Sequence, residues 1–299
     1  MRIRSTLPLL GIGALVLSAC STTVLSSAPE TTATTLPPAT VPEPVVTEPE
    51  PVDEPATTTS STTTSSTTTS STTTTTTTSP PSIALDSPLE AVGTNSGDET
   101  RRLQERLLEL GFWLGATDGQ YGVTTRQAVM AAQKYLGLTA DGVAGPETVA
   151  QLSNLTEEPR GRAEAGTLVE VDKSRQLLFF VIDGVTEWIL NTSTGTEIPY
   201  ERPNSNDPEI IESGSSITPT GLHEVDRQRA EGWWEGDLGE IYRPKYFVGG
   251  VAVHGSNSIP DYPASHGCVR VSVPAMDWIW EQELMPMSSP VWVYGEIPG

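Results

Sequence analysis

The sequence predicts a multidomain protein in which a disordered linker precedes a small all-α domain and then a mainly-β domain. Residues 57–79 are 23 consecutive Ser or Thr residues, which cannot bury enough apolar surface to offset the entropy of an ordered chain. From about residue 96 apolar residues recur with a helical period, and from residue 166 they form short runs typical of strands. Of the 299 residues, about 88–299 remain for folding, which is enough for two small domains.

The charge balance argues against nucleic acid as a partner. The chain has 17 Lys and Arg residues against 38 Asp and Glu residues, a formal net charge of −21. No Lys or Arg occurs from Ser21 to Thr100. Because binding to a phosphate backbone requires a basic surface, nucleic-acid binding is not expected.

The first 20 residues have the pattern of an export signal. Arg2 and Arg4 precede an apolar run over residues 7–19, which is shorter than the ~20 residues that span a bilayer. The run ends in Leu-Ser-Ala-Cys at Cys20, an ending that resembles the bacterial lipoprotein signal. This resemblance implies that Cys20 carries a lipid anchor to the membrane. The alternative is an ordinary signal peptide cleaved near Ala19, and in either case the protein is expected to work outside the cytoplasm.

Residues 21–88 are predicted to form a disordered linker rich in Thr, Ser and Pro. Thr-Thr-Thr-Ser-Ser units repeat along its second half, and Pro and Glu are concentrated before them. A flexible chain of about 65 residues has a root-mean-square span of roughly 45 Å. The linker could therefore hold a folded domain well away from a membrane.

Three helices are predicted after the linker, over about residues 96–110, 124–136 and 146–152. The first two begin with pairs that have capping-box spacing, Ser96 with Glu99 and Thr124 with Gln127. Both end at a glycine, and the third begins with Pro146, which suits a first helical turn. Asp-Gly pairs occupy equivalent turns between the helices, so the segment has two similar halves.

These residues resemble the type 1 peptidoglycan-binding domain, a small three-helix module, over about residues 89–155. The resemblance implies binding to the cell wall, although such a module can also serve as a spacer. Ala132 departs from the pattern, because the family usually has an aromatic residue there. The matching residues are Leu103-Gln104, Leu110-Gly111-Phe112, Asp118-Gly119-Gln120-Tyr121-Gly122, Thr125, Ala128-Val129, Gln133, Gly137-Leu138, Asp141-Gly142-Val143, Gly145-Pro146 and Thr148.

The remaining chain is predicted to be rich in strands, with one helix. Asp183-Gly184 is a hairpin turn between two of the strands, and residues 201–216 are expected to form a long loop because Pro, Asn, Asp and Ser dominate them. Ser272 and Pro274 suit the start of a helix that runs to Glu281. Strands are expected over about 168–171, 176–181, 186–190, 221–225, 246–248, 251–253 and 291–293.

A thiol and two histidines carry the candidate chemistry. If Cys20 is lipidated, Cys268 is the only thiol of the mature chain, and His254 and His266 both lie within 14 residues of it. A thiol with an ordinary pKa of ~8.5 is mostly protonated at neutral pH, and a neighbouring imidazole can lower that pKa to roughly 3.5–7.5. The pattern therefore indicates a cysteine nucleophile with a histidine base.

Either histidine could be the base. His266 lies two residues from the thiol within a Gly turn, whereas His254 ends a separate strand and could approach the sulfur with its second ring nitrogen held by a backbone carbonyl such as that of Gly255. We favour His254. The turn at Gly267 and Cys268 is expected to supply backbone N–H donors for an oxyanion.

Residues 166–297 resemble the L,D-transpeptidase (YkuD-like) catalytic domain, which has a β-sandwich-like fold. The motif is His254-Gly255 followed by Ser265-His266-Gly267-Cys268-Val269-Arg270, supported by Leu177, Ser193-Thr194-Gly195 and Thr218-Pro219-Thr220-Gly221. The resemblance implies that Cys268 is the nucleophile and His254 its proton acceptor and donor. It also implies that His266 and Gly267 build the anion site, that Ser265 braces the loop, and that Arg270 orients the turn or the substrate. The loop over residues 255–264 is shorter than in several members, which bears on acceptor specificity.

The implied reaction is acyl transfer between peptidoglycan stem peptides in the cell wall. Cys268 would attack the carbonyl before the D-alanine at position four, and an amine of a second stem would resolve the thioester to a 3→3 cross-link. Water as acceptor would make the protein an L,D-carboxypeptidase instead. The scheme needs no metal or organic cofactor, and carbapenem-type inhibitors are expected to acylate the thiol.

Two other hypotheses compete with this one. His254, His266 and Cys268 could hold zinc, although a convincing fourth ligand is missing. The protein could also be a wall-binding lipoprotein whose β-domain has lost activity. Separately, Trp233 and Trp234 could line a substrate groove or cover the edge of a core.

Overall fold

The structure is a computed structural model that describes residues 85–298, all of them within one compact unit, Thr74–Gly299. The predictions for the signal segment, Cys20 and most of the linker lie outside the described residues. None of the helices formed by residues 85–298 has the length and apolar character needed to cross a membrane. A helical part followed by a mainly-β part confirms the predicted fold class.

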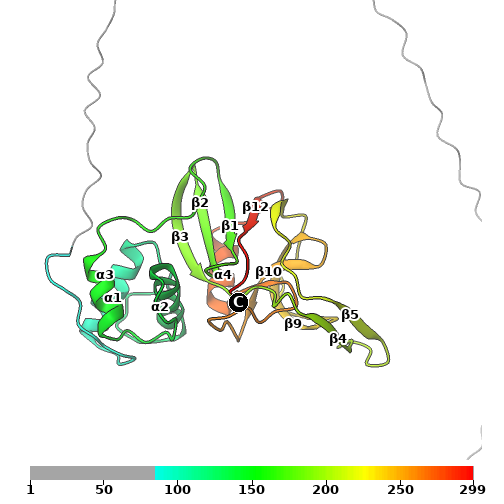
Figure 1. Cartoon of the computed structure of the whole chain (residues 1–299), viewed down its shortest axis with the longest axis horizontal. Helices are drawn as coiled ribbons and strands as arrows, with labels where there is room; N and C mark the ends of the chain where they lie inside the picture. Colours follow the sequence, from blue (N-terminus) through cyan, green and yellow to red (C-terminus); the bar gives the residue numbers. More distant parts are fainter. Residues whose placement is uncertain (1–84, 299) are drawn as a thin grey trace, which may run out of the picture. The chain divides into compact units, whose positions relative to one another are not determined.

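The helical part contains three helices, as expected, and they lie together in Figure 1. They are α1 (Asp98–Glu109), α2 (Val123–Leu136) and α3 (Pro146–Asn154). Leu103, Leu107 and Leu152 are fully buried between them, which accounts for the helical spacing of the leucines.

The two predicted capping boxes are wrong. The N-caps of α1 and α2 are Gly97 and Gly122, and neither helix has a side-chain cap. The Ser96 hydroxyl instead accepts a hydrogen bond from the backbone N–H of Tyr121, at 2.9 Å. The side chain is therefore used to join two loops rather than to start a helix.

The predicted similarity of the two halves is visible in their turns. Gln104 donates to the Asp118 carboxylate at 3.1 Å and accepts from the N–H of Gly119 at 2.7 Å. Gln133 makes the same two bonds with the second turn, at 2.8 Å to Asp141 and 2.9 Å from the next N–H. Each helix thus holds the Asp-Gly turn that follows it.

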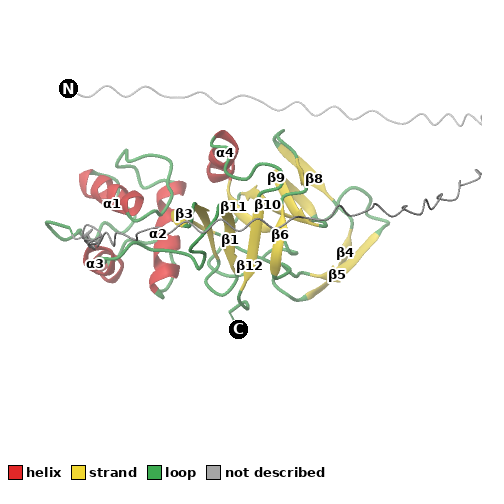
Figure 2. Cartoon of the chain, turned by 90° about the horizontal axis from the view of Figure 1, so that it is seen from above, coloured by secondary structure: helices red, strands yellow, loops and turns green. Residues whose placement is uncertain are grey.

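The mainly-β part consists of two sheets and a small hairpin (Figures 1 and 2). The first sheet has the order β3-β2-β1-β12-β6, and in the second the order is β11-β10-β9-β7 with β8 also paired to β9. The strands are β1 (Leu168–Asp172), β2 (Leu177–Ile182), β3 (Val185–Asn191), β4 (Pro199–Pro203), β5 (Ile211–Ser215), β6 (Gly221–Glu224), β7 (Arg227–Gln228), β8 (Trp233–Gly236), β9 (Gly239–Val248), β10 (Val251–Ser256), β11 (Val269–Ser272) and β12 (Pro290–Tyr294).

The two sheets share one apolar core with helix α4 (Val273–Glu281). Val171 and Val293 enter it from the first sheet and Val253 from the second, while Met276 enters it from α4, and all four are at most 1% exposed. The prediction that Ser272 caps this helix is confirmed, because its hydroxyl accepts from the N–H of Ala275. The strands of the second sheet are thereby held with one face against the core.

The predicted long loop over residues 201–216 is wrong, because β4 and β5 pair there as an antiparallel hairpin. Its turn is closed by Asn204, whose N–H donates to Ile210 at 2.8 Å and whose side-chain oxygen accepts from Asn206. Most of its residues are exposed, so the strands lack the alternating apolar pattern that would have revealed them. Strands β7, β8 and β11 were also not predicted.

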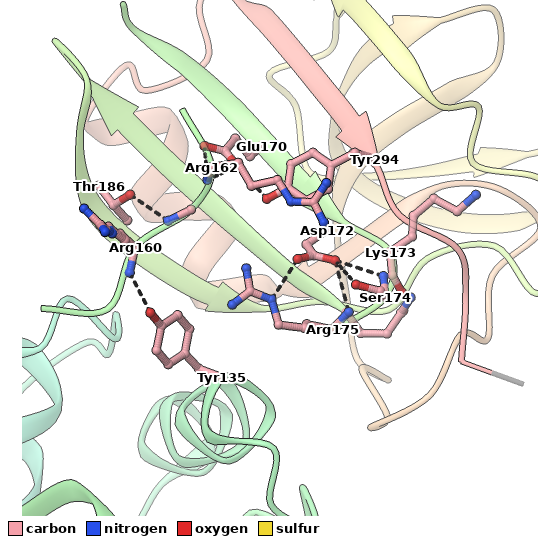
Figure 3. Close-up of polar contacts among 12 residues, drawn as sticks. Tyr135, Arg160, Arg162, Glu170, Asp172, Lys173, Ser174, Arg175, Thr186 and Tyr294 are labelled. Atoms are coloured by element: carbon pink, nitrogen blue, oxygen red, sulfur yellow. Dashed lines mark hydrogen bonds and ion pairs between the residues drawn. The ribbon is translucent and has the colours of Figure 1, made fainter. Parts of the chain in front are cut away.

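The segment that leads from α3 into β1 is pinned to the first sheet (Figure 3). The carboxylate of Glu170, which is fully buried, accepts from the N–H groups of Arg162 and Ala163 and from the Tyr294 hydroxyl. The Arg162 guanidinium lies 4.2 Å above the Tyr294 ring. A buried carboxylate that is satisfied in this way fixes the path of the segment.

The helical part also contacts β3 directly. Trp113 donates to the carbonyl of Ile189 at 3.0 Å, and Ile189 donates to that of Gly111 at 2.8 Å. Phe112 and Ile189 are fully buried in one apolar cluster with residues of α1, α2 and β2. The core of the helical part is thus completed by the first sheet.

Candidate active site

Adjacent strands of the second sheet bring the predicted nucleophile and base to one face. Strands β10 and β11 pair in parallel, with Val253 opposite Val269 and His254 opposite Arg270. Side chains alternate along a strand, so Cys268 and Arg270 share a face with His254, away from the buried valines. Cys268 lies two residues before the strand partner of His254, on the neighbouring strand, so the Cα atoms of Cys268 and His254 are about 8 Å apart. All three side chains line one pocket of about 610 Å³.

His254 is buried and held as a potential base. Its Nδ1 lies 2.8 Å from the Gly255 carbonyl, which can only accept, so Nδ1 carries the proton and Nε2 has a free lone pair. Burial lowers the pKa of His254 to about 4, the Gly255 carbonyl opposes this shift, and Arg270 adds to it. The imidazole is therefore neutral at neutral pH.

The Cys268 thiol does not have the lowered pKa that its neighbours led us to expect. Burial raises the pKa of Cys268, and the Ala252 backbone and Arg270 only partly oppose the shift. Its Sγ lies 3.8 Å from the Gly250 carbonyl, and within residues 85–298 no hydrogen bond joins it to His254. Because the imidazole is itself neutral, it offers the thiolate no charge, and the resting pair is a neutral thiol with a neutral imidazole.

The turn before Cys268 is braced by Ser265. The Ser265 hydroxyl donates to the Cys268 carbonyl at 2.5 Å and accepts from the N–H of Gly267 at 3.0 Å. The expectation that Gly267 supplies its N–H to an oxyanion therefore needs correction, since this N–H already has a partner. The N–H of Cys268 makes no hydrogen bond to the described part of the chain and is the remaining backbone donor of the turn.

The motifs around Gly195 and Thr218 form the support behind this turn. Thr218 donates to the Gly267 carbonyl at 2.7 Å and accepts from the N–H of Gly195 at 2.9 Å. A Cβ atom on Gly195 would lie 1.9 Å from the Ser216 carbonyl oxygen and 2.9 Å from the Gly267 Cα. Only glycine fits at this contact, so the motif acts through close backbone packing.

His266 points to the β4–β5 hairpin rather than to the thiol. Its ring packs edge-on against Tyr200, with centroids 5.0 Å apart, and its Nε2 lies 3.4 Å from an Arg202 nitrogen. Burial lowers the pKa of His266, and Arg202 and Arg270 add to the shift. Of the two candidate bases, His254 has the free nitrogen on the face that carries the thiol.

The other two predicted site residues lie beside His254. Burial lowers the pKa of Arg270, while Cys268 opposes the shift. At Gly255 a Cβ atom would lie 2.9 Å from the Tyr242 ring, so this position also admits only glycine. Its carbonyl is the partner of the imidazole, and its close packing fixes that carbonyl.

Two further pocket residues were missed in the sequence analysis. Arg227 on β7 and Arg229 just after it line the same pocket as Cys268, together with Trp234 on β8 and Tyr246 on β9. Trp234 was one of two tryptophans that could line a substrate groove, and Tyr246 was expected only as a strand residue. The zinc alternative gains no geometric support, because no three His, Cys, Asp or Glu residues within 85–298 come together as a metal site.

Comparisons with known proteins match the two folded parts. A family model described as a peptidoglycan binding domain matches residues 96–152, and one described as an L,D-transpeptidase catalytic domain matches residues 166–293. The crystal structure of an L,D-transpeptidase from Xylanimonas cellulosilytica is 42% identical, with a TM-score of 0.61. The match covers 72% of this chain and 100% of that chain.

Two amidases match a shorter stretch. The N-acetylmuramoyl-L-alanine amidase CwlM of Mycobacterium tuberculosis is 45% identical over 65 residues, and a probable N-acetylmuramoyl-L-alanine amidase of Bacillus licheniformis is 40% identical over 75 residues. These matches cover 22% and 24% of this chain. The chain spans only 16% and 21% of the length of these relatives.

Proposed function

We propose that this chain, which belongs to the L,D-transpeptidase family, forms 3→3 cross-links between peptidoglycan stem peptides by acyl transfer through Cys268. The observation that carries the proposal is the placement of Cys268 and His254 on one sheet face, in one pocket. Cysteine dependence and each residue's role are part of the proposal.

In the first half-reaction the donor stem is acylated onto the sulfur. The Nε2 of His254 takes the thiol proton as Sγ bonds to the carbonyl carbon between residues three and four. The N–H of Cys268 donates to the oxyanion. When the tetrahedral adduct collapses, the C–N bond breaks, D-alanine leaves with the proton from His254, and a thioester remains.

The second half-reaction reverses these roles. The acceptor amine, on the third residue of another stem, loses a proton to Nε2 and attacks the thioester carbon. The C–S bond breaks, and the sulfur recovers its proton from His254. A neutral pair suits this cycle, because the same nitrogen must accept and return a proton in each half-reaction.

The rest of the chain is assigned to localisation. The helical part binds peptidoglycan, a lipid on Cys20 anchors the chain to the cell membrane, and the linker lets the catalytic part reach into the wall. A chain with this arrangement works outside the cytoplasm.

The activity is tested with residues 74–299 and a soluble tetrapeptide stem. Release of D-alanine together with a 3→3 cross-linked product, identified by mass, is the expected result. D-alanine release with only tripeptide product would indicate an L,D-carboxypeptidase. Intact mass should also show one carbapenem adduct, located on Cys268. Absence of both D-alanine release and the adduct would contradict the proposed function.

Wall binding is tested separately with the same chain carrying Cys268→Ala, which excludes acyl-enzyme capture. We expect it to sediment with purified wall sacculi even in the presence of excess soluble stem peptide. The intact unit is required because Ile189 of β3 completes the core of the helical part. If soluble stems displace the chain completely, binding runs through the catalytic pocket and the helical part is a spacer.

A further inference from the structure

The catalytic pocket is lined by three arginines that have no acidic partner. They are Arg227, Arg229 and Arg270, and none of them belongs to an ion pair among residues 85–298. The chain has more than twice as many acidic as basic residues, 38 against 17. Leaving three guanidinium groups unpaired in one pocket indicates that an anion from outside the chain fits there.

Two of these arginines are held in place by aromatic rings. The Arg227 guanidinium lies 4.0 Å from the centroid of the Tyr246 ring, and that of Arg229 lies 3.7 Å from the centroid of the Trp234 ring. Stacking holds each planar group in place. Arg227 also donates from Nη2 to the Gly249 carbonyl at 3.4 Å, and its remaining N–H donors can serve a further acceptor. The pair is therefore pre-organised for a planar anion.

Arg229 also has an unmet hydrogen-bonding requirement. Its Nε–H is buried and has no partner within the described chain. A buried donor without an acceptor costs free energy, and such groups in proteins usually mark a missing ligand or water. An acceptor supplied by a bound substrate would remove this cost.

The sheet register connects the arginines to the nucleophile. Arg227 pairs with Tyr246, and Tyr246 pairs with Ala252. Cys268 precedes Val269, the partner of Val253, and so continues this row on β11. Tyr246 is thus about two strand spacings, or roughly 10 Å between Cα atoms, from Cys268.

The electrostatic environment of Tyr246 agrees with this placement. Burial raises the pKa of Tyr246, Arg227 and Arg229 oppose the shift, and the Cys268 sulfur adds to it. The arginine pair and the sulfur are thus both near enough to influence the phenol. A group bonded to the scissile carbonyl would pass close to the phenol on its way to the arginines.

We propose that Arg227, Arg229 and Tyr246 form a subsite for the C-terminal carboxylate of the donor stem, on the residue that leaves. This deepens the proposed function and rests on it. The carboxylate lies only two atoms beyond the scissile nitrogen, so it must sit within a few ångströms of the sulfur. It is planar and anionic, which matches a stacked guanidinium with a free N–H edge.

The acidic residues of the pocket support the choice of this occupant. Glu212 lines it from β5, and Glu235, Asp237 and Glu240 line it from β8, β9 and the turn between them. These carboxylates would repel a second anion and leave the arginine side as the place for one. The subsite thus fixes which end of the donor stem points toward β7.

The test compares two donors that differ only at the C-terminus, a tetrapeptide stem with a free carboxylate and the same stem as a primary amide. We expect the wild type to prefer the carboxylate by about tenfold or more in kcat/KM, as for a hydrogen bond to a charged group. Arg229→Gln and Arg227→Gln should lower kcat/KM mainly for the carboxylate donor, so that the two donors react at similar rates. Tyr246→Phe should make the preference for the carboxylate donor smaller.

The matched control is Arg162→Gln, which removes a guanidinium stacked on a ring outside the pocket and should keep the preference. Alkylation of Cys268 by neutral iodoacetamide, at wild-type rate, shows that each variant retains the site. The proposed subsite is wrong if the wild type shows no preference for the carboxylate donor, or if both arginine variants keep that preference. It is also wrong if the arginine variants lose kcat/KM equally for both donors. A wild type inactive on both donors would instead contradict the proposed function.

Discussion

Replacement of Cys268 by alanine is expected to abolish D-alanine release and carbapenem labelling, with a loss of at least about 10³-fold in kcat. Cys268 is the only cysteine of residues 74–299, so no second thiol can substitute. Its support by Ser265 and Thr218 does not depend on the sulfur, because both bind backbone atoms. The variant should therefore stay folded and keep the wild-type unfolding midpoint. Turnover is measured as D-alanine released per enzyme.

Two further measurements decide whether the sulfur acts as nucleophile. Cys268→Ser should retain the turn but form no detectable acyl-enzyme, which would here be an oxygen ester, because an alkoxide is far harder to generate than a thiolate. EDTA should leave the wild type unaffected. Full turnover by Cys268→Ala would refute the mechanism, and loss of wild-type turnover in EDTA would revive the zinc alternative.

Elements with a regular apolar pattern were predictable from the sequence, and irregular ones were not. The leucines of α1 have helical spacing because one face of that helix is buried, and Val251–Val253 form a continuous apolar run because consecutive residues of β10 are buried. The hairpin of β4 and β5 is mostly exposed, so its composition indicates a loop. Ser96 was misassigned because a capping serine and a loop-binding serine have the same local sequence.

The residues of the site also fall into predictable and unpredictable ones. His254, Ser265 and Cys268 were found because their motif is contiguous or nearly so. Arg227 and Arg229 belong to or follow a strand of two residues, and they reach the pocket only through the register of β7 with β9. No pattern in one chain encodes that pairing. The direction of the pKa shift of the Cys268 thiol could not be predicted either, since the shift depends on burial rather than on neighbours in the sequence.

Replacement of His254 by glutamine is expected to lower kcat/KM by about 10²–10⁴-fold, the range for loss of a general base. The pH dependence of the wild-type rate shows which form of His254 is active. Because the pKa of His254 is lowered to about 4, the imidazole is a free base above that pH and protonated below it. The rate should fall on the acid side only near pH 4, and that limb should disappear in His254→Gln. The control is His223→Gln, a strand histidine whose ring contacts the Pro219 carbonyl, which should keep the rate and the limb.

The alkaline side distinguishes a neutral pair from an ion pair. Since burial raises the pKa of Cys268, the thiolate forms only above the ordinary range for a thiol. Alkylation by iodoacetamide should therefore be slow at pH 7 and increase only as the pH rises above the ordinary thiol pKa of ~8.5. A thiolate–imidazolium ion pair between Cys268 and His254 would instead be alkylated fast at pH 7, and the alkylation rate would fall only at acid pH. The pKa of the His254 imidazolium would then be far above 4. That result would mean that His254 holds the thiolate before substrate arrives, and the proton transfer proposed for the first half-reaction would be wrong.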